Sequence, residues 1–141
     1  MGYEMRGWSA TAPEGHYFRM SRCCWGLVWD VCREIVPDIV TEDVSRWTEH
    51  SQGMQRDDAR LLGETLLAAV SQGQALSFAQ RRRAGTPRAT PATAREGRTQ
   101  TVRPLEGYAA SEELDLILDN LPAIVQGFGR FCIASGGFSV W

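Results

Sequence analysis

The sequence predicts an α+β fold in which a small antiparallel sheet packs against several helices. Residues alternate between two faces at both ends of the chain, as in strands, whereas the stretches between the ends carry apolar residues at helical spacing. The chain has 141 residues, so a single domain over 1–141 is expected. Because an isolated hairpin is only marginally stable in water, the terminal strands are expected to join in one sheet.

An N-terminal hairpin is expected over residues 3–20. Residues 3–9 alternate between two faces, which indicates a strand. Residues 12–15 read Ala-Pro-Glu-Gly, with proline and glycine at the positions favoured in a type I turn. Alternation resumes over 16–20, which therefore predicts the returning strand.

Helices are expected in the middle of the chain. Residues 23–36 are apolar almost all round, so this helix is predicted to lie at the centre of the fold, with its tryptophans Trp25 and Trp29 in the core. A short helix is predicted over 42–50 because Thr41 precedes it as a capping residue.

A longer amphipathic helix is predicted from Arg56 to Gln72. Asp57 and Asp58 in its first turn favour the helix dipole, and Gly73 follows its end. A further turn or two is expected over 75–82.

The C-terminal region predicts a helix followed by a strand. Residues 114–132 keep one apolar stripe in phase, and Pro122 inside that stripe predicts a kink or a break. Gly136 and Gly137 are expected to end the helix. Residues 138–141 then predict a short strand that completes the sheet.

Charge is segregated along the chain. The net charge is −2, but residues 81–103 contain seven arginines and one acid, a charge of +6, whereas the rest of the chain carries −8. Residues 84–103 are rich in Arg, Thr, Pro and Ala and lack apolar periodicity, so a flexible insertion is expected there. Such an arm is either solvated, docked on the acidic body, or bound to an acidic partner.

The candidate binding residues are the arginines of this segment and two tryptophans. A protein partner is favoured over nucleic acid, because the arm has no aromatic residue to stack on bases and the acidic body repels phosphates. The two tryptophans fall on otherwise polar faces, and exposed tryptophan is typical of binding hot spots. The full set is Arg81, Arg82, Arg83, Arg88, Arg95, Arg98, Arg103, Trp8 and Trp47.

Cysteines raise two further possibilities, a metal site and a nucleophile. Cys23 or Cys24 and Cys32 are eight or nine residues apart, which places them about 12–13 Å apart along a helix, too far to share one zinc ion. A thiol near a helix N-terminus can have a lowered pKa, and His16 or His50 would serve as its base. Core packing is the more frequent role of cysteine in an apolar run.

No cofactor or metal is predicted. The sequence contains no lysine, which excludes a lysine Schiff base and a phosphate-loop lysine. It also contains no run of about 20 apolar residues and begins without the apolar stretch of a signal peptide. We therefore expect a cytoplasmic protein with reduced cysteines and no membrane partner.

Two stretches of the sequence are informative in combination. Residues 55–62 read Gln-Arg-Asp-Asp-Ala-Arg-Leu-Leu, and residues 128–140 read Phe-Gly-Arg-Phe-Cys-Ile-Ala-Ser-Gly-Gly-Phe-Ser-Val. This combination resembles small uncharacterised bacterial proteins, in which an Asp-Ala helix is followed by an aromatic-Cys-Gly-Gly-Phe terminus that ends in a strand. The resemblance implies the α+β fold and no particular activity or site. The arginine-rich arm has no counterpart in it.

The sequence favours a non-enzymatic cytoplasmic protein that binds another protein, as an immunity protein, an inhibitor or an adaptor does. One alternative is a nucleic-acid-associated accessory factor that acts through the arginine-rich arm. The other is a small enzyme with a cysteine nucleophile.

Overall fold

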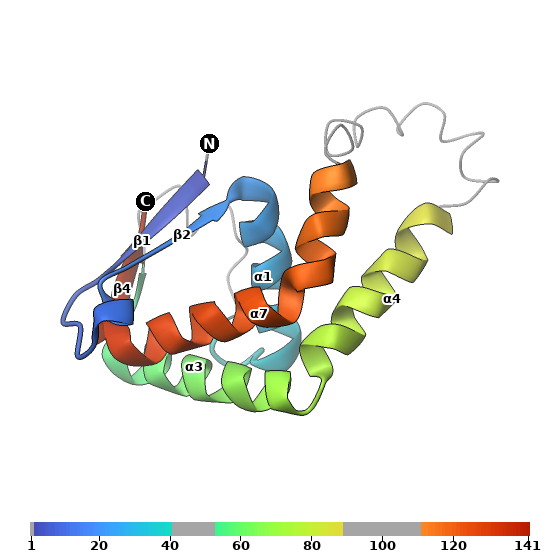
Figure 1. Ribbon diagram of the computed structural model, residues 1–141. Coiled ribbons are helices and arrows are strands. Elements are labelled where there is room, and N and C mark those ends of the chain that lie inside the picture. The colour runs from blue at the N-terminus through green and yellow to red at the C-terminus, as the bar shows by residue number, and fades with distance from the viewer. Residues whose placement is uncertain (1, 41–52, 89–110) are drawn as a thin grey trace.

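The computed structural model describes residues 2–40, 53–88 and 111–141, and these form an α+β fold (Figure 1). The elements are β1 (Gly2–Gly7), the 3-10 turn η1 (Pro13–Gly15), β2 (Tyr17–Ser21), α1 (Arg22–Ile35), β3 (Gly53–Met54), α3 (Arg56–Ser71), α4 (Gln74–Arg88), α7 (Ser111–Ser135) and β4 (Phe138–Val140). The predicted fold class is confirmed. The predicted helix over 42–50 lies outside the described residues.

The sheet is antiparallel with the strand order β2-β1-β4-β3. The predicted hairpin is confirmed, with Met5 opposite Phe18, and the C-terminal strand joins its far side, with Met5 opposite Val140. Strand β3 was not predicted, because two residues are too short to show any alternation. It pairs Met54 with Phe138 at the edge of the sheet.

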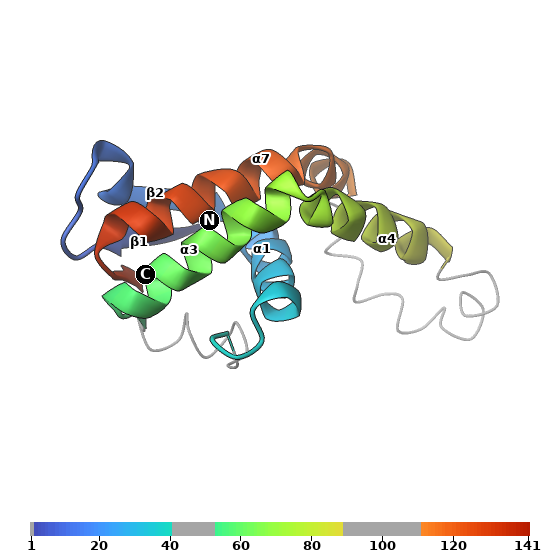
Figure 2. The same ribbon diagram turned by 90° about the horizontal axis from the view of Figure 1, so that it is seen from below.

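One face of the sheet packs against the helices. Met5, Phe138 and Val140 point inward and are fully buried. The ring of Phe138 packs 5.3 Å from that of Phe131 and 6.0 Å from that of Phe128, both on α7. Figures 1 and 2 show α3 and α7 side by side, and the helices that contact strands β1 and β2 are α7 and α1. The core therefore lies between the sheet and the helices.

Helix α1 lies in the core as predicted. Ser21 caps it, because its side-chain oxygen accepts a hydrogen bond from the backbone N–H of Cys24 at 3.1 Å. Trp25 and Trp29, one turn apart, are each 1% exposed, and their ring centroids lie 5.1 Å apart. The edge of Trp25 also meets the ring of Phe128, so α1 and α7 share one aromatic cluster.

Helix α7 runs without interruption through Pro122 and bends along its length (Figure 1). Proline has no N–H to donate within the helix, which explains the bend and confirms the predicted kink. The segment Glu112–Ser135 is long and apolar enough to span a membrane by composition, with a mean hydropathy of 1.2. The most apolar 18-residue window of this segment is 44% buried within the fold, and the core helix of a soluble protein passes the same test of length and composition.

Helix α4 corrects the predicted start of the arginine-rich arm. An irregular segment was expected from residue 84, but α4 continues to Arg88 and includes Pro87. Pro87 has no N–H, so the helix lacks the one hydrogen bond that this residue would donate to the carbonyl of Arg83. The remainder of the predicted insertion, residues 89–103, lies outside the described residues.

Candidate interaction surfaces

The sheet presents a second face away from the helices, which we call the outer sheet face. Side chains alternate along a strand, so the neighbours of buried Met5, Phe138 and Val140 point to the opposite side. The same alternation applies to β2, whose Phe18 packs against the rings of α7. The outer sheet face consists of Glu4, Arg6, Tyr17, Arg19, Ser139 and Trp141.

Strand register arranges these side chains in two rows across three strands. Arg6 lies between Tyr17 and Ser139 in the first row. In the second row, Glu4 lies opposite Arg19 and is joined to Trp141 by two backbone hydrogen bonds of 2.7 and 3.1 Å. Adjacent strands lie about 4.8 Å apart, so the side chains within each row are close neighbours.

Aromatic and charged groups share this face. Trp141 is 60% exposed, and its indole N–H donates a hydrogen bond to the Ser139 hydroxyl at 3.0 Å, which orients the ring. Tyr17 is 46% exposed. Arg6 contacts Glu4 at 3.3 Å, whereas Arg19 has no ion-pair partner among the described residues. Among the described residues, the face therefore offers two exposed aromatic rings, of which Trp141 is oriented by Ser139, and one cation without an ion-pair partner, Arg19.

Neither Tyr17 nor Trp141 was among the predicted site residues. The alternation at the C-terminus contained the signal for Trp141: once Phe138 and Val140 face inward, Trp141 has to face outward. The structure places Trp141 on the outer sheet face accordingly.

Trp8 is exposed, as predicted, and follows directly after β1. It is 49% exposed, and its backbone N–H donates a hydrogen bond to the carbonyl oxygen of Gly137 at 2.8 Å. Its ring also lies against Gly137, where a side-chain methyl group would overlap the indole. Trp8 thus combines an exposed ring with a fixed position at the end of α7. Trp47 lies outside the described residues.

Three of the predicted arginines contact acids of the protein itself. Arg81 binds the carboxylate of Glu34 on α1 through both terminal nitrogens, at 2.7 and 3.3 Å. This hydrogen bond, together with the charge of Glu34, raises the pKa of Arg81. Arg82 lies 3.3 Å from the carboxylate of Asp30, also on α1.

Arg83 reaches the other neighbouring helix. Its guanidinium donates hydrogen bonds to the carboxylate of Asp119 at 2.8 Å and to the backbone oxygen of Asp115 at 3.2 Å, both on α7. The arginines at the start of the basic segment are therefore docked on the acidic body. The side chains of Arg88, Arg95, Arg98 and Arg103 lie outside the described part of the chain.

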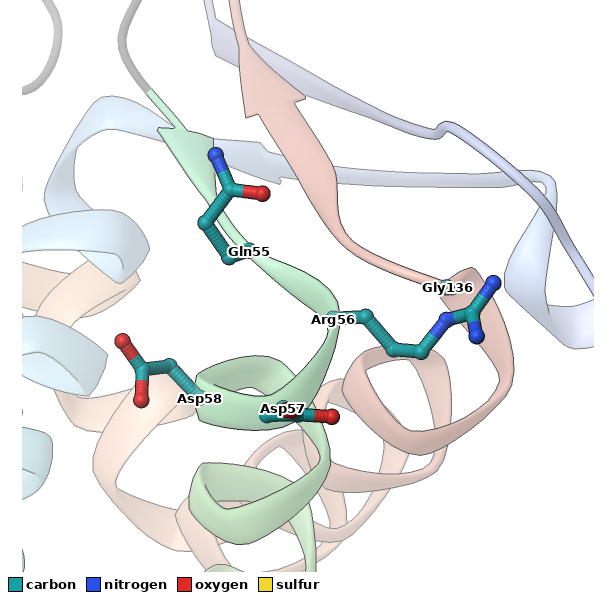
Figure 3. Close-up of a pocket in the computed structure, with 5 residues that line it drawn as sticks. All are labelled: Gln55, Arg56, Asp57, Asp58 and Gly136. Atoms are coloured by element: carbon teal, nitrogen blue, oxygen red, sulfur yellow. The ribbon is translucent and has the colours of Figure 1, made fainter.

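A cleft of about 600 Å³ lies at the start of α3 (Figure 3). Arg56 extends towards Gly136, whereas the carboxylate of Asp58 and the amide of Gln55 point in other directions. The two acids, Asp57 and Asp58, lie in the first turn of α3, as predicted, where they favour the helix dipole. Because these side chains diverge, they do not form an acid–base pair.

A position near a helix N-terminus can lower the pKa of a thiol, but the pKa values of Cys23 and Cys24 are raised. Burial, and then the charges of Cys23 and Glu113, raise the pKa of Cys24 to about 11. Burial likewise raises the pKa of Cys23, Cys32 and Cys132. Within the described ranges, no three His, Cys, Asp or Glu side chains are placed to hold a metal ion.

Comparisons of the chain with protein-family models, with curated proteins and with solved structures found no match. The resemblance of residues 55–62 and 128–140 to small bacterial proteins therefore stays a prediction.

Proposed function

We propose that this protein acts by binding another protein through its outer sheet face. The observation that supports this function most directly is the exposure of Trp141 and Tyr17 on either side of Arg6 and Glu4. Tryptophan, tyrosine and arginine are the residue types most enriched in binding hot spots. Mounted on a paired sheet, they lose little conformational freedom when a partner binds.

Protein recognition fits the charges of this face better than nucleic-acid recognition does. Aromatic side chains on a sheet also stack on single-stranded bases, but such sites need cations along the phosphate backbone. Here Arg6 is engaged by Glu4, and the chain as a whole carries a net charge of −2. A partner that contributes apolar side chains and a few acids matches these groups more closely.

A non-enzymatic role agrees with the state of the thiols. A cysteine nucleophile reacts as the thiolate, and a pKa raised to about 11 keeps Cys24 protonated at neutral pH. The protein would then act as an immunity protein, an inhibitor or an adaptor in the cytoplasm, where its function is to present a surface.

The test compares two double variants in affinity purification at low and high salt. Tyr17→Ala with Trp141→Ala removes both rings of the outer sheet face. Leu61→Ala with Leu116→Ala is the matched control, because these leucines are 51% and 62% exposed on α3 and α7. We expect the first variant to bind its partner at least roughly thirtyfold more weakly, a loss of about 2 kcal/mol typical of hot spots.

The control variant should retain the partner with unchanged affinity. Equal binding by both variants would contradict the proposed surface. Nucleic acid that co-purifies with the protein would appear as excess absorbance at 260 nm that salt removes. This result would support the alternative of a nucleic-acid-associated factor instead of protein recognition.

A further inference from the structure

A second charged surface lies on α4, at the opposite end of the molecule from the sheet (Figure 1). It consists of the consecutive arginines Arg81, Arg82 and Arg83, which we call the arginine triad. Each guanidinium of the triad is occupied by a carboxylate of the same chain, at distances of 2.7 to 3.3 Å. These carboxylates belong to Glu34, Asp30 and Asp119.

The three ion pairs are exposed to solvent. Every side chain in them is between 40% and 61% exposed. Pairs of this kind contribute little net stability, because water solvates the separated charges well and the paired side chains lose rotamer freedom. The arginine side chains can therefore exchange one carboxylate for another at small cost, without any movement of the helices.

A groove with both apolar and charged side chains lies beside the triad. The guanidinium groups of Arg81 and Arg82 each lie 5.8 Å from the ring centre of Phe78, which is itself buried. Phe78, Val40 and Pro37 line a groove of about 680 Å³ between α1 and α4, together with charged side chains that include Asp30 and Arg82. A ligand at the triad would thus meet arginines beside a groove that also contains apolar side chains.

We propose that the arginine triad binds an acidic segment of a partner protein, and that Asp30, Glu34 and Asp119 compete with this segment for the same guanidinium groups. The two-nitrogen contact of Arg81 with Glu34 shows that the triad accepts a carboxylate in the geometry that arginine favours. The internal acids hold the positions that the acids of a partner would take. This site is separate from the outer sheet face and does not rest on the function proposed for it.

The surroundings favour a protein segment over a nucleic acid. When the arginines turn away to bind a partner, four acids remain beside the site. These are Asp30 and Glu34 on α1 and Asp115 and Asp119 on α7. A nucleic acid brings a phosphate at every nucleotide and would meet these carboxylates at close range. A protein segment can place neutral or apolar residues beside them and its acids only at the arginines.

The first experiment separates release of the triad from a change in net charge. Asp30→Asn with Glu34→Gln and Asp119→Asn removes the charges of the three carboxylates that pair with the triad. Glu14→Gln with Glu64→Gln and Glu112→Gln is the control: it removes the same charge, and Glu64 is the ion-pair partner of Arg60 on α3. Binding of fluorescent polyglutamate is measured by anisotropy at low salt.

We expect the first variant to bind polyglutamate at least about fivefold more tightly than the control, because the apparent affinity of a site rises with the fraction of protein that is free to bind. Adding Arg81→Gln, Arg82→Gln and Arg83→Gln to the first variant should abolish this gain. Equal binding by the first variant and the control would overturn the proposal.

The class of partner is tested on the wild-type protein, which keeps the carboxylates beside the triad, with oligodeoxythymidylate and with a peptide in which glutamates alternate with alanines. Binding of this single-stranded DNA as tight as binding of the peptide would overturn the assignment to a protein segment. Melting temperatures establish that each variant is folded. If the triple variant is unfolded, the single variants Glu34→Gln and Glu64→Gln give the same comparison, since each removes the partner of one exposed arginine.

Discussion

Trp25 and Trp29 link three parts of the molecule. They are neighbours on α1, and Trp25 contacts Tyr3 of β1 and Phe128 of α7 through its ring. Large aromatic side chains bury more apolar surface than any other residues, and tilted or edge-on ring contacts add to the stability gained from burial. The helix α1 therefore holds the sheet and α7 together.

Replacing Trp29 by alanine is expected to lower the free energy of unfolding by about 3–5 kcal/mol, because the cavity is too large for the neighbours to close. Leu76→Ala, on an exposed part of α4, should change it by less than about 0.5 kcal/mol. Urea unfolding followed by circular dichroism measures both. An unchanged midpoint for Trp29→Ala would contradict its placement in the core.

The thiols are expected to react slowly at neutral pH. A raised pKa means that the folded protein keeps its thiols protonated at pH values where a free cysteine has begun to ionise. Alkylation should therefore begin at Cys23, the most exposed of the four, and should accelerate as the pH rises above about 9. Fast labelling of one thiol at pH 7, located by mass spectrometry, would support the alternative of a small enzyme with a cysteine nucleophile.

The connection between α7 and β4 depends on two glycines and on the loop after β1. Gly136 and Gly137 have φ angles of +72° and +99°, which other residues rarely adopt. The backbone N–H groups of Ser9 and Thr11 donate hydrogen bonds to the carbonyls of Ser135 and Ala134, at 2.9 and 2.8 Å. The loop after β1 thereby satisfies carbonyls at the end of α7.

Substituting Gly136 by alanine should destabilise the protein by at least about 1–2 kcal/mol, because a left-handed backbone is strained in alanine. The added methyl group would also overlap the backbone of Ser9. Gly26→Ala is the matched comparison: its methyl group meets open space on α1. Removing a glycine from a helix should stabilise the protein by about 0.5–1 kcal/mol. Thermal unfolding of both variants measures these two opposite changes in stability. If Gly136→Ala stabilises the protein, the left-handed backbone conformation at Gly136 is wrong.

The first arginines of the basic segment, Arg81, Arg82 and Arg83, are neutralised by acids on the neighbouring helices α1 and α7. Arg83 of α4 contacts Asp119 of α7, 36 residues further along the chain, while Arg81 and Arg82 contact α1. The first three arginines of the basic segment are therefore paired with acids of the acidic body, and all three ion pairs are exposed to solvent.

Replacing residues 89–103 with a short Gly/Ser linker should leave the fold intact. The entropy of closing a loop depends only logarithmically on its length, so the melting temperature is expected to change little. Residues 84–88 are retained because they belong to α4. Thermal unfolding followed by circular dichroism tests this, and a fall of more than about 4 °C, or about 1 kcal/mol, would show that the replaced residues contribute to stability.

The sequence by itself determined the elements whose signals are local. Alternation and turn residues specified the N-terminal hairpin, the apolar run specified α1 as a core helix, and Gly73 and Gly136 marked where two helices end. These features depend on the stereochemistry of a few neighbouring residues, which the chain carries with it. Among the predicted binding residues, the exposure of Trp8 and of Arg81–Arg83 also followed from such patterns.

Tertiary structure decided what depends on contacts between distant segments. Strand β3 pairs with β4 alone, and α4 extends past its predicted end, where Arg83 meets Asp119 of α7. The outer sheet face gathers Tyr17 and Trp141 from opposite ends of the chain. No local pattern specifies which strand lies beside which, because strand order is selected by the packing of the whole core.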